Sequence, residues 1–385
     1  MNALAIVAAL GTGVSLLYYG AATLAALRLR RAAAGPIPAL PKIVPRVAVL
    51  KPLRGRGKAL AENLTSYLEN DYTRSEFYFA VSDYEDPAAE VAVALRTQYQ
   101  FAPITLVVGE EPGCVNRKVG KLIRMAERAR RAEIFILSDA DIGVTRDHLR
   151  RVVAELTTDE SIGVVTCLYR ARPVGTLASR LEALFVNTDF APQVMLSTAL
   201  EPVRYALGAT IAIKRAALDQ LGGLQRLKDL LADDFYLGKF AADAGYQVHL
   251  SDSLVTTSCE ERHLADFWRH QLRWARTYRT TRPASLATIL VHGPSWALLF
   301  LLTTGFSLFA WVAAAVVLAA RIAMARWMIT RILGLRDLGR EAWLVVLKDL
   351  ILTGIWFASL ASNQVEWGGR RFRILADGAM REAHD

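Results

Sequence analysis

The sequence predicts an α/β domain, built on a mostly parallel sheet with helices on both faces, together with transmembrane helices at both ends. Three observations lead to this fold class. Hydrophobic residues make up 53% of the 385 residues, although the chain also carries 46 Lys and Arg and 37 Asp and Glu. Long uncharged stretches lie towards both ends, and short apolar runs alternate with amphipathic stretches between residues 46 and 282. A water-facing domain and membrane spans are therefore both expected.

The composition excludes several other classes of protein. With 13 Pro and three widely separated cysteines (Cys114, Cys167 and Cys259), the chain is not a disordered, collagen-like or small disulfide-rich protein. No C-x-x-C pair occurs, so we expect neither structural zinc nor disulfides, and a reducing, cytoplasmic setting for the central domain. The net charge of +9 gathers beside apolar runs, which indicates membrane flanks and no nucleic-acid partner.

The first element is an N-terminal membrane anchor over residues 1–31. Residues 1–27 carry no charged side chain, and this stretch is long enough to cross a bilayer. Arg28, Arg30 and Arg31 follow it. The positive flank places the C-terminal side of this span in the cytoplasm. A cleaved signal peptide is the alternative, but the apolar run is longer than is usual and the basic residues follow it instead of preceding it.

The central region, residues 46–282, alternates strand-like and helix-like segments. Apolar runs at 47–50, 77–81, 104–108, 134–137 and 162–167 predict strands, and stretches such as 118–130 predict helices. In open sheets of this kind, ligands bind outside the carboxyl ends of the strands. An aromatic, basic stretch at 263–282 closes the region and is typical of a helix lying at a membrane surface.

The C-terminal third contains two further apolar segments. Residues 283–320 have no Asp, Glu, Lys or Arg and predict a transmembrane hairpin turning near 303–306. Five arginines in 321–342 predict a cytoplasmic return. The third segment, 343–364, contains Lys348 and Asp349, so it is either a crossing with an internal ion pair or a segment lying in the interface. The basic tail, 365–385, favours the cytoplasm, whereas a full crossing would place it outside. We expect a multi-pass membrane protein whose central domain is cytoplasmic.

Two carboxylates at the end of one predicted strand are the strongest chemical signal. Asp139 and Asp141 follow the apolar run 134–137, and side chains two apart in extended backbone point the same way. Mg²⁺ or Mn²⁺ prefers one or two carboxylates plus phosphate oxygens, so the pair is a candidate seat for a divalent metal and a diphosphate. A solvated turn is the alternative.

Other charged residues lie at similar positions. Asp83 follows the strand at 77–81 and is a ligand candidate, whereas Asp86, next to Pro87, is better explained as a helix cap. Lys51 and Lys118 lie at strand or helix ends where a cation suits an anionic leaving group, with solvated surface lysines as the alternative.

Asp233 and Asp234 begin an apolar helical stretch, where acidic residues are ordinary capping partners. The functional alternative is a general base, which needs only hydrogen-bond reach to an acceptor hydroxyl.

Taken in order, these pieces resemble the membrane-bound glycosyltransferases of the family 2 and 21 type, with ceramide glucosyltransferases and bacterial hopanoid glycosyltransferases as the nearest groups. The matching segments lie at 49–55, 83–87, 116–118, 138–141, 233–235, 273–274 and 367–373. The resemblance implies the nucleotide-sugar-binding fold of type A glycosyltransferases. It also implies binding of a nucleotide sugar by Lys51, Asp83, Lys118, Asp139, Asp141, Arg273 and Trp274, with metal at Asp139 and Asp141.

By the same resemblance Asp234 is the catalytic base, and Asp233 and His270 are candidates for the acceptor side. The family pattern has Gln or Arg where this chain has His270, which leaves the contact of His270 open. The implied reaction moves a hexose from a UDP-sugar to a membrane-lipid hydroxyl with inversion. A hopanoid N-acetylglucosaminyl-type transferase and an inactive nucleotide-sugar-binding scaffold are the alternatives, and a processive polysaccharide synthase would need more membrane spans.

Overall fold

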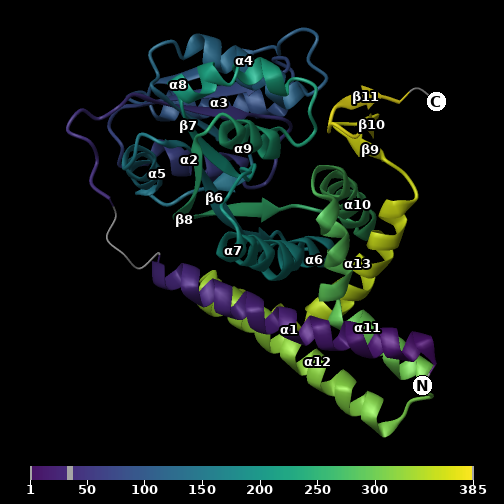
Figure 1. The fold of residues 1–385 in the computed structure, drawn as a ribbon. Helices are drawn as coiled ribbons and strands as arrows, with labels where there is room; N and C mark the ends of the chain where they lie inside the picture. Colours follow the sequence, from purple (N-terminus) through teal and green to yellow (C-terminus); the bar gives the residue numbers. More distant parts are fainter. Residues whose placement is uncertain (1, 33–37, 384–385) are drawn as a thin grey trace.

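The computed structural model describes residues 2–32 and 38–383. Met1, at the start of the predicted anchor 1–31, and residues 384–385, at the end of the predicted tail 365–385, lie outside the described residues. Figure 1 shows an α/β domain set against long helices from both ends of the chain.

Eight strands of the described chain form one sheet in the order β3-β2-β1-β4-β7-β6-β8-β5. Their bounds are β1 Val47–Pro52, β2 Ser75–Val81, β3 Ile104–Val108, β4 Ile134–Ser138, β5 Ile142–Gly143, β6 Ile162–Pro173, β7 Thr210–Lys214 and β8 Gln247–Cys259. β1 pairs in parallel with β2 and β4, β2 with β3, and β6 with β8, whereas β7 runs antiparallel between β4 and β6. Each of the five predicted strands is present, and the mostly parallel α/β sheet is confirmed.

Helices cover both faces of the sheet because successive strand residues point to opposite sides. Val47 and Val49 of β1 pack in one core cluster, and Ala48 and Leu50 pack in the other. The first cluster includes residues from α2 (Leu60–Leu68), α3 (Pro87–Gln98), α5 (His148–Thr157), α6 (Leu177–Phe185) and α7 (Ala191–Leu200). The second includes α4 (Arg117–Arg128), α8 (Arg215–Gln220) and α9 (Asp233–Asp243). The last helix of the region is α10 (Leu264–Thr281).

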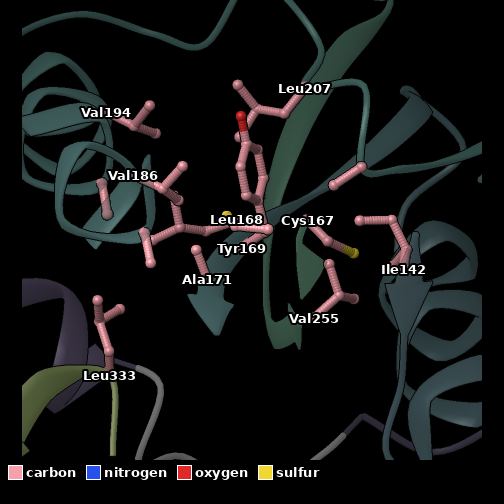
Figure 2. Packing of buried hydrophobic residues seen from close by; sticks show 14 of the residues in the cluster. Ile142, Cys167, Leu168, Tyr169, Ala171, Val186, Val194, Leu207, Val255 and Leu333 are labelled. Atoms are coloured by element: carbon pink, nitrogen blue, oxygen red, sulfur yellow. The ribbon is translucent and has the colours of Figure 1, made fainter. Parts of the chain in front are cut away.

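The core continues from the sheet into the helices that face the membrane segments. Figure 2 shows Leu168, Tyr169 and Ala171 of β6 with Val186 and Val194 from the helices that follow. Leu333, which lies beyond the apolar helix α12 (Leu308–Trp327), belongs to the same cluster. The α/β domain and the membrane helices therefore share one core at this place.

Three described helical segments are long and apolar enough to cross a membrane: Ala3–Arg31, Leu308–Ile332 and Arg336–Leu360. A fourth span is counted if Pro283–Val291 and Gly293–Thr303, which meet at a bend of 62°, form one crossing. Figure 1 shows α1 (Ala3–Ala32) and α12 running side by side away from the α/β domain. α11 (Gly293–Thr303) ends where the sequence predicts the hairpin turn, and the last long helix is α13 (Val345–Leu360).

The first arm of the predicted hairpin is broken at His292, and local residues explain the break. Pro294 has no backbone N–H to continue the preceding helix. The Gly293 N–H donates to the Tyr19 hydroxyl of α1 at 3.1 Å, and an added Cβ on Gly293 would lie 2.4 Å from that hydroxyl. The bend therefore forms where α11 packs closely against α1.

Lys348 and Asp349, which the sequence marks as charges inside an apolar segment, lie in a buried ionic network. The Asp349 carboxylate accepts from Arg321 Nε at 2.8 Å and lies 2.8 Å from Lys348 Nζ. Arg321 Nη2 also lies 2.9 Å from Asp189, which pairs with Lys348 as well. All four side chains are 2% exposed or less, and the network joins α12 and α13 to the π-helical segment Val186–Phe190 between α6 and α7.

The basic tail folds as a small sheet of β9 (Gln364–Trp367), β10 (Arg370–Ile374) and β11 (Met380–Glu382). Its apolar residues Val365, Phe372 and Met380 pack on Leu231, just before α9. The Met380 N–H donates to the Asp229 carbonyl at 2.7 Å. The tail therefore docks on the α/β domain.

Candidate active site

A cavity of about 600 Å³ opens beside the strand ends and brings most of the predicted site residues together. Its lining includes Lys118, Asp139, Asp141, Asp233, Asp234, His270, Arg273 and Trp274. The cavity continues along α7 and α10 towards the segment Pro283–Val291, which precedes the membrane helix α11. It therefore joins a cluster of charged groups to the side of the molecule where the long apolar helices lie.

Lys118 lies between two of the carboxylates. Its Nζ is 2.8 Å from Asp139 Oδ1 and 3.3 Å from Asp233 Oδ2. Asn116 caps α4 by accepting from the Val119 N–H, which fixes the start of the helix that presents Lys118. Burial alone would lower the pKa of Lys118, but Asp139 and Asp233 outweigh it and hold the pKa above its usual range. The lysine therefore stays cationic at the centre of the site.

Asp139 and Asp141 follow β4 directly, as the sequence predicts for strand-end residues. The Asp141 carboxylate accepts from Thr257 Oγ1 of β8 at 2.7 Å. Burial, followed by the charge of Asp139, raises the pKa of Asp141. A buried carboxylate beside a second carboxylate favours a cation close to both.

Asp233 and Asp234 begin α9 and differ in their partners. Asp233 accepts from Asn116 Nδ2 at 3.3 Å and pairs with Lys118. Asp234 faces the cavity, and burial together with the charge of Asp233 raises its pKa to about 6. A methyl group at Gly208 would lie 2.8 Å from Asp234 Oδ2 and 3.6 Å from Asp139 Oδ2, so this glycine lets both carboxylates approach one stretch of backbone.

The wall of the cavity on the α10 side is aromatic. The Trp274 ring packs edge-on against Phe185 at 5.7 Å, Tyr278 at 5.7 Å and His270 at 5.4 Å between ring centroids. Arg273 lines the same cavity, and burial lowers its pKa. His270 itself lies between two carboxylates, 3.2 Å from Glu182 and 3.3 Å from Glu261.

Two predicted nucleotide-sugar ligands, Lys51 and Asp83, are absent from the lining of this cavity. Lys51 is fully buried, and its Nζ donates to Ser138 Oγ at 3.2 Å and to the Ile142 carbonyl at 3.1 Å. Burial lowers the pKa of Lys51 to about 7. Asp83 is exposed in the loop between β2 and α3. Asp86 caps α3 by accepting from the Ala88 N–H, as predicted.

Several residues around the cavity were not found from the sequence. Glu182, Glu261, Gly208 and Thr257 carry no local motif, and their roles arise from packing between distant elements. Glu182, Glu261 and His270 place one possible ligand atom each within 4.8 Å of one another.

Comparison with known proteins agrees with this architecture. The chain is 24% identical over 251 residues to ceramide glucosyltransferase 3 of Caenorhabditis elegans, covering 65% of this chain and 53% of the relative. It is 25% identical over 233 residues to ceramide glucosyltransferase 1 of the same organism, covering 60% and 50%. The chain thus spans about half the length of these relatives.

Among solved structures, a mannosyltransferase from Pyrobaculum calidifontis, in complex with GDP-Man and Mn²⁺, superposes with a TM-score of 0.53 at 21% identity. The match covers 92% of this chain and 99% of that one. This likeness confirms the type A glycosyltransferase fold. The sequence profile of glycosyl transferase family 21 matches residues 7–380, which is nearly the whole chain, and the protein therefore belongs to glycosyl transferase family 21.

Proposed function

We propose that the protein transfers a hexose from a UDP-sugar to the hydroxyl of a membrane lipid with inversion, in the manner of a ceramide glucosyltransferase. The observation that carries the proposal is the single cavity joining the charged cluster around Lys118 to the segment that enters the membrane helices. A donor with a diphosphate suits the charged end, and a lipid suits the end beside α10 and α11.

In the proposed reaction Asp234 accepts the proton of the lipid hydroxyl. The oxygen then attacks the anomeric carbon from the face opposite the diphosphate, and the bond between that carbon and the diphosphate oxygen breaks with its electron pair leaving on UDP. Lys118 stabilises the charge on the departing diphosphate, an electrostatic role that needs no rearrangement of the site. Asp234, with a pKa of about 6, is largely ionised at neutral pH and is a suitable base.

The residues also suit a divalent cofactor, Mg²⁺ or Mn²⁺. Asp139 and Asp141 offer carboxylate oxygens in the donor half of the cavity, and hard cations prefer such oxygens together with phosphate. A metal held there would neutralise charge on the diphosphate. Chelation with EDTA should stop transfer, and added Mn²⁺ or Mg²⁺ should restore it. Full activity in metal-stripped protein would remove this role from the pair.

The acceptor half is supported by a second, smaller cavity of about 70 Å³. It shares Trp274 and Tyr278 with the large cavity and adds Leu352 and Ile355 of α13. Apolar side chains next to an aromatic wall suit the hydrocarbon part of a lipid whose hydroxyl lies near its head group.

The test is transfer with purified protein in lipid nanodiscs. Labelled UDP-glucose and UDP-N-acetylglucosamine should each be offered with ceramide and with a polyol-bearing hopanoid. We expect glucosylated ceramide as the main product. Transfer of N-acetylglucosamine to the hopanoid would select the alternative function. Donor binding without transfer to any lipid would indicate a nucleotide-sugar-binding scaffold.

A further inference from the structure

Three charged side chains from three elements meet beside the α10 wall of the cavity, and we refer to Glu182, Glu261 and His270 as the charged triad. Glu182 lies on α6, Glu261 follows β8, and His270 lies on α10. His270 Nδ1 is 3.2 Å from Glu182 Oε1 and 3.3 Å from Glu261 Oε1. One imidazole nitrogen therefore faces two carboxylates at once.

We propose that His270 acts as a cation in this triad and positions Arg273 and Trp274 over the donor site, so that transfer requires the protonated imidazole. His270 would be a positioning residue, because its ring touches Trp274 and not the reacting atoms. This proposal rests on the proposed function where glycosyl transfer is the activity that is measured, and the protonation of His270 can be measured without it.

The geometry favours a charged imidazole. The Glu182 side chain is 2% exposed and already accepts from Gln271 Nε2 at 2.9 and 3.0 Å, so its carboxylate is held in place. A neutral ring can donate from Nδ1 as well, but two carboxylates within 3.3 Å of that nitrogen also stabilise the positive charge of the protonated ring, which favours the imidazolium. Glu182 of α6 and Glu261 after β8 face His270 from neighbouring elements. The cation of Arg273 lies near His270 on the same helix, α10, and the thiol of Cys259, at the end of β8, lies close to both glutamates.

The protonation equilibrium agrees with the geometry. Burial alone would lower the pKa of His270, but the charge of Glu182 and hydrogen bonds to both glutamates raise it from 6.5 to about 9. A raised pKa means that the contribution of this group to folding is complete below pH 6.5 and is lost as the pH rises through 9.

The triad is connected to both halves of the site. The His270 ring packs edge-on against Trp274, one turn further along α10. On the other side, Glu261 follows β8, whose Thr257 donates to Asp141 at 2.7 Å. Loss of the proton on His270 would therefore loosen α10 where it covers the donor site.

A metal ion at the triad is the competing explanation, because these three residues could also ligate one. A protonated imidazole has no lone pair for a metal, so the two explanations exclude each other. The cations of His270 and Arg273 also balance the two glutamate charges, which leaves no net negative charge to attract an ion.

The test compares pH profiles of kcat/KM for four proteins in nanodiscs. Wild-type activity should fall about tenfold per pH unit above about pH 9. Glu261→Gln removes one carboxylate and should move this fall to lower pH. His270→Arg keeps a permanent cation and should abolish the fall up to pH 10. His249→Gln, at an exposed strand position, is the matched control and should behave as wild type.

A direct measurement follows the His270 imidazole by NMR as the pH is raised, which needs no substrate. Titration near 9 in wild type and lower in Glu261→Gln is expected, even if no donor and acceptor pair supports transfer or if His270→Arg fails to fold. Titration at or below 6.5 would overturn the proposal. An alkaline fall of kcat/KM that is unchanged in both Glu261→Gln and His270→Arg would overturn it as well. A metal ion that stays bound in Asp139→Ala but is lost in Glu261→Gln would also overturn it.

Discussion

Asp233 and Asp234 are neighbours in the first turn of α9, yet their surroundings assign them different tasks. Asp233 is tied to Lys118 and Asn116, which makes it part of the framework that holds the lysine. Both carboxylates line the cavity and burial raises the pKa of both, and the pKa of Asp234, at about 6, suits proton transfer. The difference comes from partners on α4 and could not be predicted from two adjacent aspartates in the sequence.

The first prediction concerns the base. Asp234→Asn should reduce kcat by about 10²- to 10⁴-fold, because a placed general base contributes an effect of that size. UDP binding, measured by calorimetry, should remain. Asp233→Asn is the matched control and should cause a smaller loss, because Lys118 keeps Asp139 as a partner. A dead Asp233→Asn beside an active Asp234→Asn would reverse the assignment.

The second prediction concerns pH. Since burial and Asp233 raise the pKa of Asp234 to about 6, kcat/KM should fall as the pH drops below 6 and reach its plateau above it. The sign follows from the need for an ionised base. The residual activity of Asp234→Asn should lack this acidic limb. A wild-type limb near pH 4 would show that a less perturbed carboxylate controls the rate.

How far the site could be predicted depends on where each residue lies. Asp139 and Asp141 follow a strand and Asp234 starts a helix, so the rule for ligand sites at strand ends points to them directly. Lys51 and Asp83 carry the same local signal, but one is buried beneath the site and the other lies in an exposed loop. Glu182 has no local signal, because its partners His270 and Gln271 lie on a helix nearly 90 residues away.

At the scale of elements, the ionic network around Arg321 explains how charges persist in apolar helices. Arg321 of α12 and Lys348 of α13 each pair with both Asp189 and Asp349, so two positive charges meet two negative charges. Buried ions are tolerated when they are paired and hydrogen-bonded. From the sequence, an internal pair of Lys348 and Asp349 was one of two alternatives for this segment, and Asp189 and Arg321 join the pair only through tertiary packing.

The third prediction tests this network. Arg321→Met should lower the free energy of unfolding by about 3–5 kcal/mol, because it leaves buried carboxylates with one cation instead of two. Thermal unfolding in nanodiscs measures the loss as a lower midpoint. Arg331→Met, at an exposed position a few turns further on, is the control and should change the midpoint little. Equal effects of both substitutions would show that the network does not stabilise the contact between α12 and α13.

Strands and helices were predicted with unequal success for physical reasons. Four of the five predicted strands are fully buried apolar runs, which is the pattern that a covered parallel sheet imposes on its sequence, and the edge strand β3 is partly buried. The bend at His292 was missed because apolar composition is the same in a straight and a broken helix. The small C-terminal sheet was missed because its basic residues hide the alternation of Val365, Phe372 and Ile374.

At the scale of the whole molecule, the contacts of α13 bear on the topology. Before α13, Asp337 pairs with Arg172 of β6 at 2.8 Å and Glu341 with Arg180 of α6 at 3.5 Å. After α13, the Ser362 carbonyl accepts from Arg279 of α10 at 3.0 Å, and the C-terminal sheet packs against Leu231. Both ends of α13 therefore contact the α/β domain.

These contacts favour the interfacial alternative for 343–364. The 16 residues of α13 alone extend over about 24 Å, which is less than the roughly 30 Å hydrocarbon core, and the segment Arg336–Leu360 is long enough to cross only if its 3-10 part, Arg336–Leu344, belongs to the span. A helix that starts and ends at one domain returns the chain to the same side of the bilayer. If α1 crosses once, and the bent pair 283–303 and α12 cross out and back, the basic tail would lie on the same side of the bilayer as the α/β domain, which agrees with the positive charge of the tail.

The fourth prediction tests this arrangement by cysteine labelling in a Cys114→Ser background, in which the remaining Cys167 and Cys259 are buried. Tyr84→Cys, Arg336→Cys and Ala376→Cys, all at exposed positions, should be labelled from the cytoplasmic side in inverted vesicles. Ser307→Cys, between α11 and α12, is the control for the opposite side and should be labelled only in intact cells. Cytoplasmic labelling of Tyr84→Cys with external labelling of Ala376→Cys would mean that 343–364 crosses the bilayer. External labelling of Tyr84→Cys would contradict the donor assignment as well, since UDP-sugars are made in the cytoplasm.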